Sequence, residues 1–124
     1  MLYLSSGLLV LIGFAHSYLG ERYILIRLFR REDLPRLFGG DDFTKRTLRF
    51  AWHITTLCWW GFAAILLLLA RGEASPDVIG LIVGVTFTLH FLVALIGSRG
   101  KHLSWIVFLA VALLAVFASL NVSL

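Results

Sequence analysis

Residues 50–70 of the chain read FAWHITTLCWWGFAAILLLLA, a stretch without Lys, Arg, Asp or Glu. A helix needs about 20 mainly apolar residues to cross the hydrocarbon core of a bilayer, so this stretch predicts a transmembrane helix. Three further apolar stretches accompany it, at residues 2–25, 78–96 and 103–124. The sequence therefore predicts an all-α integral membrane protein, a single four-transmembrane-helix domain over residues 1–124.

The composition leaves little room for a soluble catalytic module. Hydrophobic residues make up 60% of the 124 residues and charged residues only 15%, whereas soluble domains contain roughly 45–50% apolar residues. A single cysteine, Cys58, excludes an internal disulfide and any metal motif that needs several cysteines. The net charge of +4 is better explained by orientation in a membrane than by nucleic acid binding, so we expect no nucleic acid partner.

The distribution of basic residues predicts the orientation. Most Lys and Arg residues lie between residues 22 and 49, the second connection carries only Arg71 beside two carboxylates, and the third is the basic turn at residues 99–101. Cytoplasmic loops are enriched in Lys and Arg, so the first and third connections are predicted to be cytoplasmic and both termini outside, in a bacterial-type inner (plasma) membrane. The two short connections predict an up-down four-helix bundle, in which the 2–25 and 78–96 helices are diagonal to one another.

The first connection has features of a short interfacial segment. Apolar residues alternate with charges over residues 34–38, beside Pro35, and a Gly39-Gly40 pair follows. We expect this segment to lie on anionic lipid headgroups. Asp41 or Asp42 can then cap the next helix, which would begin near Phe43, because a carboxylate there accepts free backbone N–H groups.

One histidine falls in each apolar segment or at its edge, toward the same predicted membrane face: His16, His53, His90 and His102. Ionisable side chains inside a bilayer are costly and usually functional. From the helical rise, His16 and His90 lie deepest, roughly 9–13 Å inside the cytoplasmic boundary. Imidazoles bind haem iron and also suit Zn, Cu and Fe.

We therefore predict His16 and His90 as ligands of haem b or of a transition-metal ion (Zn, Cu or Fe), with His53 as a further ligand or partner. His102 is expected to be an interfacial bystander. The alternative for the deep histidines is a neutral imidazole that is hydrogen-bonded to a hydroxyl or to a backbone carbonyl.

The 50–70 helix carries a second set of candidates. Arg46, Arg49, His53, Thr56 and Trp60 recur at steps of three or four residues, which places them on one helix face. Guanidinium groups bind phosphate and carboxylate oxygens in a bidentate manner. Arg46, Arg49, Thr56 and Trp60 are thus predicted cofactor-binding residues, holding a haem propionate, a lipid phosphate or a substrate carboxylate. The alternative is that both arginines only anchor the helix to anionic lipid headgroups.

Glu21 is a charged residue within the first apolar stretch. It follows His16 by five residues, about 140° around a helix, so the two side chains do not stack on one face. It can form an ion pair with Arg22, Arg99 or Lys101, which we favour, or orient a ligand histidine of a neighbouring helix.

Three functions are compatible with these patterns. The leading hypothesis is redox chemistry or electron transfer at a haem or metal ion, with a quinone as a candidate partner. The second is a proton or metal-ion transporter or channel with a histidine relay. The third is an accessory subunit of a larger membrane complex, and a homo-oligomer is also open. Common hydrolase, nucleotide-binding and zinc-protease motifs are absent from the sequence, and whether the protein is an enzyme stays open.

Overall fold

The computed structural model describes residues 1–122, and within them it contains helices and loops but no β-strand. Helix α1 (Leu2–Leu19) continues through the π-helical segment η1 (Gly20–Leu25) into the short α2 (Ile26–Leu28). Three more helices follow, α3 (Asp42–Arg71), α4 (Pro76–Ser98) and α5 (Ser104–Val122).

Three of the helical rods are long and apolar enough to cross a membrane: Leu2–Leu28, α3 and α4. The fourth predicted span corresponds to α5, which is apolar but shorter over Ser104–Leu120, and residues 123–124 of that span lie outside the described part. The structure thus supports an α-helical membrane protein.

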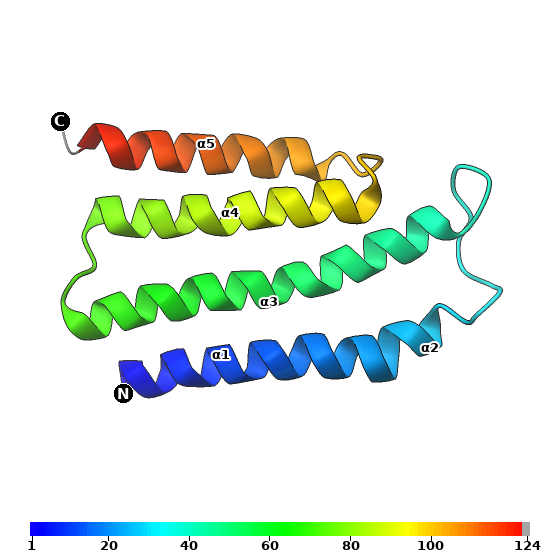
Figure 1. The fold of residues 1–124 in the computed structure, drawn as a ribbon, viewed down its shortest axis with the longest axis horizontal. Coiled ribbons are helices and arrows are strands. Elements are labelled where there is room, and N and C mark those ends of the chain that lie inside the picture. The colour runs from blue at the N-terminus through cyan, green and yellow to red at the C-terminus, as the bar shows by residue number, and fades with distance from the viewer. Residues whose placement is uncertain (123–124) are drawn as a thin grey trace.

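The helices form one layer (Figure 1). Helix α1 packs on α3, α3 on α4 and α4 on α5, and no other pair of these four helices is in contact within residues 1–122. The predicted up-and-down succession is present, but α1 and α4 lie on opposite sides of α3 instead of facing one another across a closed bundle. Lipid is as apolar as the outer faces of α1 and α5, so no hydrophobic force brings these faces together.

Small residues let neighbouring helices approach closely. A Cβ atom at Gly61 would lie 2.6 Å from the Thr86 hydroxyl, and one at Gly97 would lie 2.8 Å from Cβ of Phe50. These two glycines therefore set the spacing of α3 and α4 near mid-helix and near the α4–α5 turn. Close backbone approach at glycine is a common way to pack helices in membranes, where van der Waals contact replaces the hydrophobic effect.

The ends of the helices differ in how they are capped. Asp41 occupies the N-cap position of α3 but makes no side-chain cap hydrogen bond. Its carboxylate instead lies 2.7 Å from Nζ of Lys45, so the predicted capping role is replaced by an ion pair. Ser75 does cap α4, where its hydroxyl accepts a hydrogen bond from the N–H of Val78, and Pro76 follows at the first helical position.

The connection before α3 is irregular rather than helical. The N–H of Leu37 donates to the carbonyl of Gly40 at 2.8 Å, and the tight turn between them has positive φ angles at Phe38 and Gly39. The Phe38 side chain is exposed, with its ring 5.0 Å from that of Phe43 and 5.7 Å from the ammonium of Lys101. A location on lipid headgroups stays a prediction for this segment.

Candidate functional site

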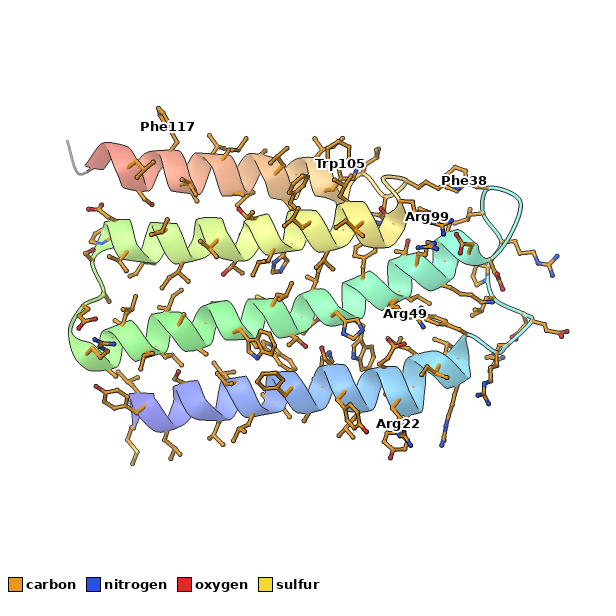
Figure 2. The ribbon with its side chains drawn as sticks, in the orientation of Figure 1. Arg22, Phe38, Arg49, Arg99, Trp105 and Phe117 are labelled. Atoms are coloured by element: carbon orange, nitrogen blue, oxygen red, sulfur yellow. The ribbon has the colours of Figure 1, made fainter. Side chains whose placement is uncertain are left out.

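The two ends of the helix layer differ in charge. Every Lys and Arg except Arg71 belongs to the segments that meet at one end, namely residues 22–49 and the α4–α5 turn. Figure 2 shows Arg22, Arg49 and Arg99 toward this end and Phe117 toward the other. We call it the basic end. Its Lys and Arg residues outnumber its carboxylates, which are Glu21, Glu32, Asp33, Asp41 and Asp42.

A chain of polar side chains runs from the basic end along the contact between α1 and α3. Arg49 places Nε and one terminal nitrogen on the two carboxylate oxygens of Glu21, at 3.2 and 2.9 Å. Glu21 also lies 3.2 Å from Nε2 of His53, whose Nδ1 is 2.9 Å from the hydroxyl of Ser17. The Ser17 hydroxyl lies 2.8 Å from that of Thr56.

The last bond of this chain constrains the direction of the others. Thr56 is 3% exposed, and its hydroxyl donates to the carbonyl of Gly13 at 3.3 Å. A hydroxyl has one hydrogen to donate, so Ser17 then donates to Thr56 and accepts from Nδ1–H of His53. The remaining contact, between Nε2 of His53 and Glu21, needs a proton of its own.

The ring of His53 can take part in this chain of bonds in two ways. With a proton on Nδ1 it donates to Ser17, and with a proton on Nε2 it donates to Glu21, which Arg49 also contacts. In the second case Ser17 donates to Nδ1 and Thr56 donates to Ser17, so the bond to Gly13 is given up. The direction of the hydroxyl groups between α1 and α3 therefore depends on the tautomer of His53.

His16 belongs to the same helix contact but packs differently. Its ring stacks on Trp52, with centroids 4.6 Å apart and planes 1° from parallel, and Trp59 packs at 4.8 Å. Nε2–H donates to the carbonyl of Trp52 at 3.3 Å, while the indole N–H of Trp52 donates to the carbonyl of His16 at 3.1 Å. Since a carbonyl only accepts, this Nε2 carries a proton and offers no lone pair to a metal.

His90 lies in a separate environment. It is 4% exposed, donates from Nδ1 to the carbonyl of Thr86 at 2.7 Å, and contacts the rings of Phe87 and of Phe108 on α5. His16 faces α3 and His90 faces α5, on helices that do not touch. The structure therefore does not bring these two histidines together. In residues 1–122 it also contains no group of three His, Cys, Asp or Glu side chains placed to hold a metal ion.

His102 lies at the basic end, in the turn between α4 and α5, and its location at the membrane interface stays a prediction. Its ring stacks 6.1 Å from Phe43 and meets Phe50 edge to face at 5.2 Å. Nδ1 accepts from the hydroxyl of Ser104 at 2.8 Å, a bond consistent with the N–H of Ser104 pointing to the same nitrogen. These contacts tie the α4–α5 turn to the start of α3.

A groove with a volume of about 530 Å³ opens between α3 and α4 at the basic end. One wall carries the polar side chains of α3, and the other is apolar, from Leu92, Val93 and Ile96 of α4. The charged and ionisable residues of the groove are Asp42, Lys45, Arg46, Arg49 and His53. The groove thus combines cationic groups at the helix ends with an apolar surface that continues toward the middle of the layer.

Each cation of the groove already has a carboxylate partner. Arg46 donates from Nε to Asp42 at 2.9 Å, but the Asp42 side chain is 64% exposed. An exposed ion pair of this kind contributes only about 0–1 kcal/mol, so another anion can replace Asp42 at small cost. Lys45 pairs with Asp41, and the hydrogen bond from Lys45 holds the pKa of that carboxyl below its usual value.

The candidates of α3 are divided between two surfaces. Arg46, Arg49 and His53 line the groove, whereas Thr56 points to α1. Trp60 donates from its indole N–H to the carbonyl of Val10 on α1 and also lines a second groove between α3 and α4. Glu21 contacts both Arg49 and His53. Its ion pair is with Arg49, which was not among the expected partners, and its contact with His53 orients a histidine of a neighbouring helix. Ser17 was not among the site residues predicted from the sequence. The pattern that could have identified it is the four-residue spacing of Gly13, Ser17 and Glu21, which places a small, a hydroxyl and an acidic residue on one face of the first helix.

The fold and charge pattern define this chain as an α-helical membrane protein with a basic end. No family model, curated protein or solved structure matches it. Its function is therefore inferred from its own residues.

Proposed function

We propose that this protein binds the anionic head of a membrane amphiphile, a phosphate or carboxylate group, in the α3–α4 groove at its basic end. The observation that carries the proposal is the placement of Arg46 and Arg49 over the apolar wall formed by Leu92, Val93 and Ile96. Such a surface matches a molecule with one charged and one apolar part. In the proposed topology all four helices span the membrane, the basic end is cytoplasmic, and both termini are outside.

Arg46 is the better anchor of the two arginines. Its partner Asp42 is exposed and can turn toward water, which frees Nε for an incoming anion, while Nη1 keeps its hydrogen bond to the carbonyl of Gly97 at 3.4 Å. Arg49 is held by Glu21 through two contacts and stacks 4.9 Å over the ring of Phe29. It adds positive charge beside the anion while staying in the polar chain of α1 and α3.

The other hypotheses have less support from the geometry. A haem or metal site at His16 and His90 requires two helices that lie on either side of α3 to meet, and Nε2 of His16 is bonded to Trp52. A Soret band lost in both His16→Ala and His90→Ala would support that alternative. Along the described α1–α3 contact, the hydrogen bonds beyond Thr56 end on the backbone carbonyls of Val10 and Ala63, so this contact gives less support to a histidine relay across the membrane.

The test is a binding titration of the purified protein in nanodiscs of zwitterionic lipid, with a long-chain alkyl phosphate and its uncharged alcohol as probes. We expect the phosphate to bind more tightly than the alcohol. Arg46→Gln should weaken phosphate binding by about 10- to 150-fold, because it removes a charge-assisted contact of roughly 1.5–3 kcal/mol.

Arg30→Gln is the matched control, since Arg30 carries the same charge at the same end but does not line the groove. Equal weakening by Arg30→Gln would mean that the basic end attracts anions only through its overall charge. Equal binding of phosphate and alcohol to the wild type would refute the proposal.

A further inference from the structure

A second groove lies between the same two helices, farther from the basic end. It has a volume of about 310 Å³ and is almost entirely apolar, with Trp60 and Thr86 as its only residues that carry a polar side-chain atom. The apolar residues of its walls are Leu57, Gly61 and Ala64 on α3 and Leu81, Ile82, Val85 and Leu89 on α4.

The residue spacing places the two grooves on one face of the helix pair. The lining residues of α3 include a series at 46, 49, 53, 57, 60 and 64, and those of α4 a series at 81, 85, 89, 92 and 96, with further lining residues beside each series. Steps of three or four residues keep to one side of a helix. The two grooves are therefore successive parts of one track along the contact between α3 and α4.

The length of the track suits a molecule that reaches far into the membrane. From Arg46 to Ala64 it extends about 27 Å along α3 at 1.5 Å per residue, close to the roughly 30 Å of the hydrocarbon core. Charge is confined to the first groove, because the second is lined by no ionisable side chain. A short anion would fill only the first groove and leave the apolar part of the track unused.

We infer that the ligand is a long-chain amphiphile, whose phosphate or carboxylate head binds at Arg46 and whose single extended chain lies along the apolar groove beside Val85. This inference rests on the proposed function and specifies its ligand class. The alignment of the apolar groove with the charged one on the same face of α3 and α4 is what distinguishes the track from an ordinary lipid-facing helix surface. Trp60, which lines the second groove, would then contact the middle of the chain.

The experiment compares two tryptophan substitutions at lipid-facing valines. Val85 lines the second groove and is 52% exposed, whereas Val107 on α5 is 61% exposed and lies away from both grooves. Alkyl phosphates with a short and a long chain, and inorganic phosphate, are titrated against each variant in nanodiscs. The Val107→Trp protein corrects for the greater partitioning of longer chains into the bilayer.

We expect the long-chain phosphate to bind about tenfold more weakly to Val85→Trp than to Val107→Trp, because an indole in the groove excludes the chain. The short-chain phosphate should bind both variants equally. Equal binding of the long-chain probe to both variants, with the Arg46→Gln effect intact, would overturn the chain site and leave the head site standing.

Two other outcomes would also contradict the inference. Inorganic phosphate binding as tightly as the long-chain probe would mean that the chain contributes nothing. A change in oligomeric state in Val85→Trp, without a change in binding by the monomer, would assign the second groove to another copy of this protein. Loss of all dependence on Arg46 would instead refute the proposed function itself.

Discussion

The packing of Trp52 against α1 makes Gly20 the position most sensitive to a single added methyl group. A Cβ atom there would clash with Nε1 and Cε2 of Trp52 and would lie 2.6 Å from its Cζ2, so it would meet the body of the indole rather than a flexible tip. Optimal carbon separations are about 3.5–4.0 Å, so in Gly20→Ala the indole must withdraw by about 1 Å. That movement disturbs the hydrogen bond from Trp52 to the carbonyl of His16 and the stack on its ring.

The expected cost follows from these two interactions. A hydrogen bond between membrane helices contributes about 0.6–1.7 kcal/mol, and an aromatic pair contributes about 0.5–1.5 kcal/mol beyond its buried area. Their loss predicts about 1–3 kcal/mol of destabilisation from packing. Alanine also has the higher helix propensity, by up to about 1 kcal/mol, which partly offsets this cost.

Gly7→Ala measures that offset directly, because a Cβ atom at Gly7 would meet nothing within 4 Å. The assay is reversible unfolding in mixed micelles with increasing SDS, followed by far-UV circular dichroism. We expect Gly20→Ala to be less stable than Gly7→Ala by about 1–3 kcal/mol. Equal stabilities, or a more stable Gly20→Ala, would refute the close packing of α1 on α3 at this position.

Three further predictions concern side-chain polar groups. Thr56→Val should lower stability by about 1 kcal/mol in the same assay, by loss of hydrogen bonds between helices, whereas Thr55→Val should have little effect, since Thr55 only donates to Ala51 of its own helix. Asp42→Asn should tighten binding of the long-chain phosphate, because it removes the carboxylate that competes for Arg46. The control Asp33→Asn makes the same charge change away from the groove and should tighten binding much less. The hydrogen bond and ion pair with Lys45 lower the pKa of Asp41. The Asp41–Lys45 pair therefore stabilises the fold at pH values above the ordinary carboxyl pKa of about 4, and this stabilisation is lost as the pH falls through the lowered pKa. Unfolding curves at a series of acidic pH values should therefore show a smaller acid-side loss of stability in Asp41→Asn than in wild type.

The helices could be predicted from hydropathy, but their ends and their lateral order could not. The apolar stretch at residues 78–96 corresponds to α4 at Pro76–Ser98, because Ser75 and Pro76 start the helix before it becomes apolar. Likewise the first stretch continues as a helical rod to Leu28, past Glu21 and Arg22. Hydropathy reports which residues suit lipid and carries no information on which helices touch, so a closed bundle and an open layer give the same pattern.

The groove residues followed from spacing along one helix, whereas the paired histidines depended on spacing between helices. Arg46, Arg49 and His53 share a face because helical periodicity fixes it, and the structure places all three along one groove. His16 and His90 share a depth, but equal depth on two helices does not fix their lateral separation. A contact of Glu21 with a histidine of a neighbouring helix was one alternative from the sequence, but the sequence did not identify His53 as that histidine, because the partner depends on how α1 and α3 align.

The open layer itself explains how an amphiphile can reach the proposed site. In a closed four-helix bundle, a groove between two helices on the inner side would be covered by the other two, and a ligand would have to enter from an end. Here α1 and α5 pack on the outer edges of the α3–α4 pair and not across its face (Figure 1). Both grooves therefore open sideways to lipid, so a chain can enter from the bilayer while its head stays at the level of Arg46.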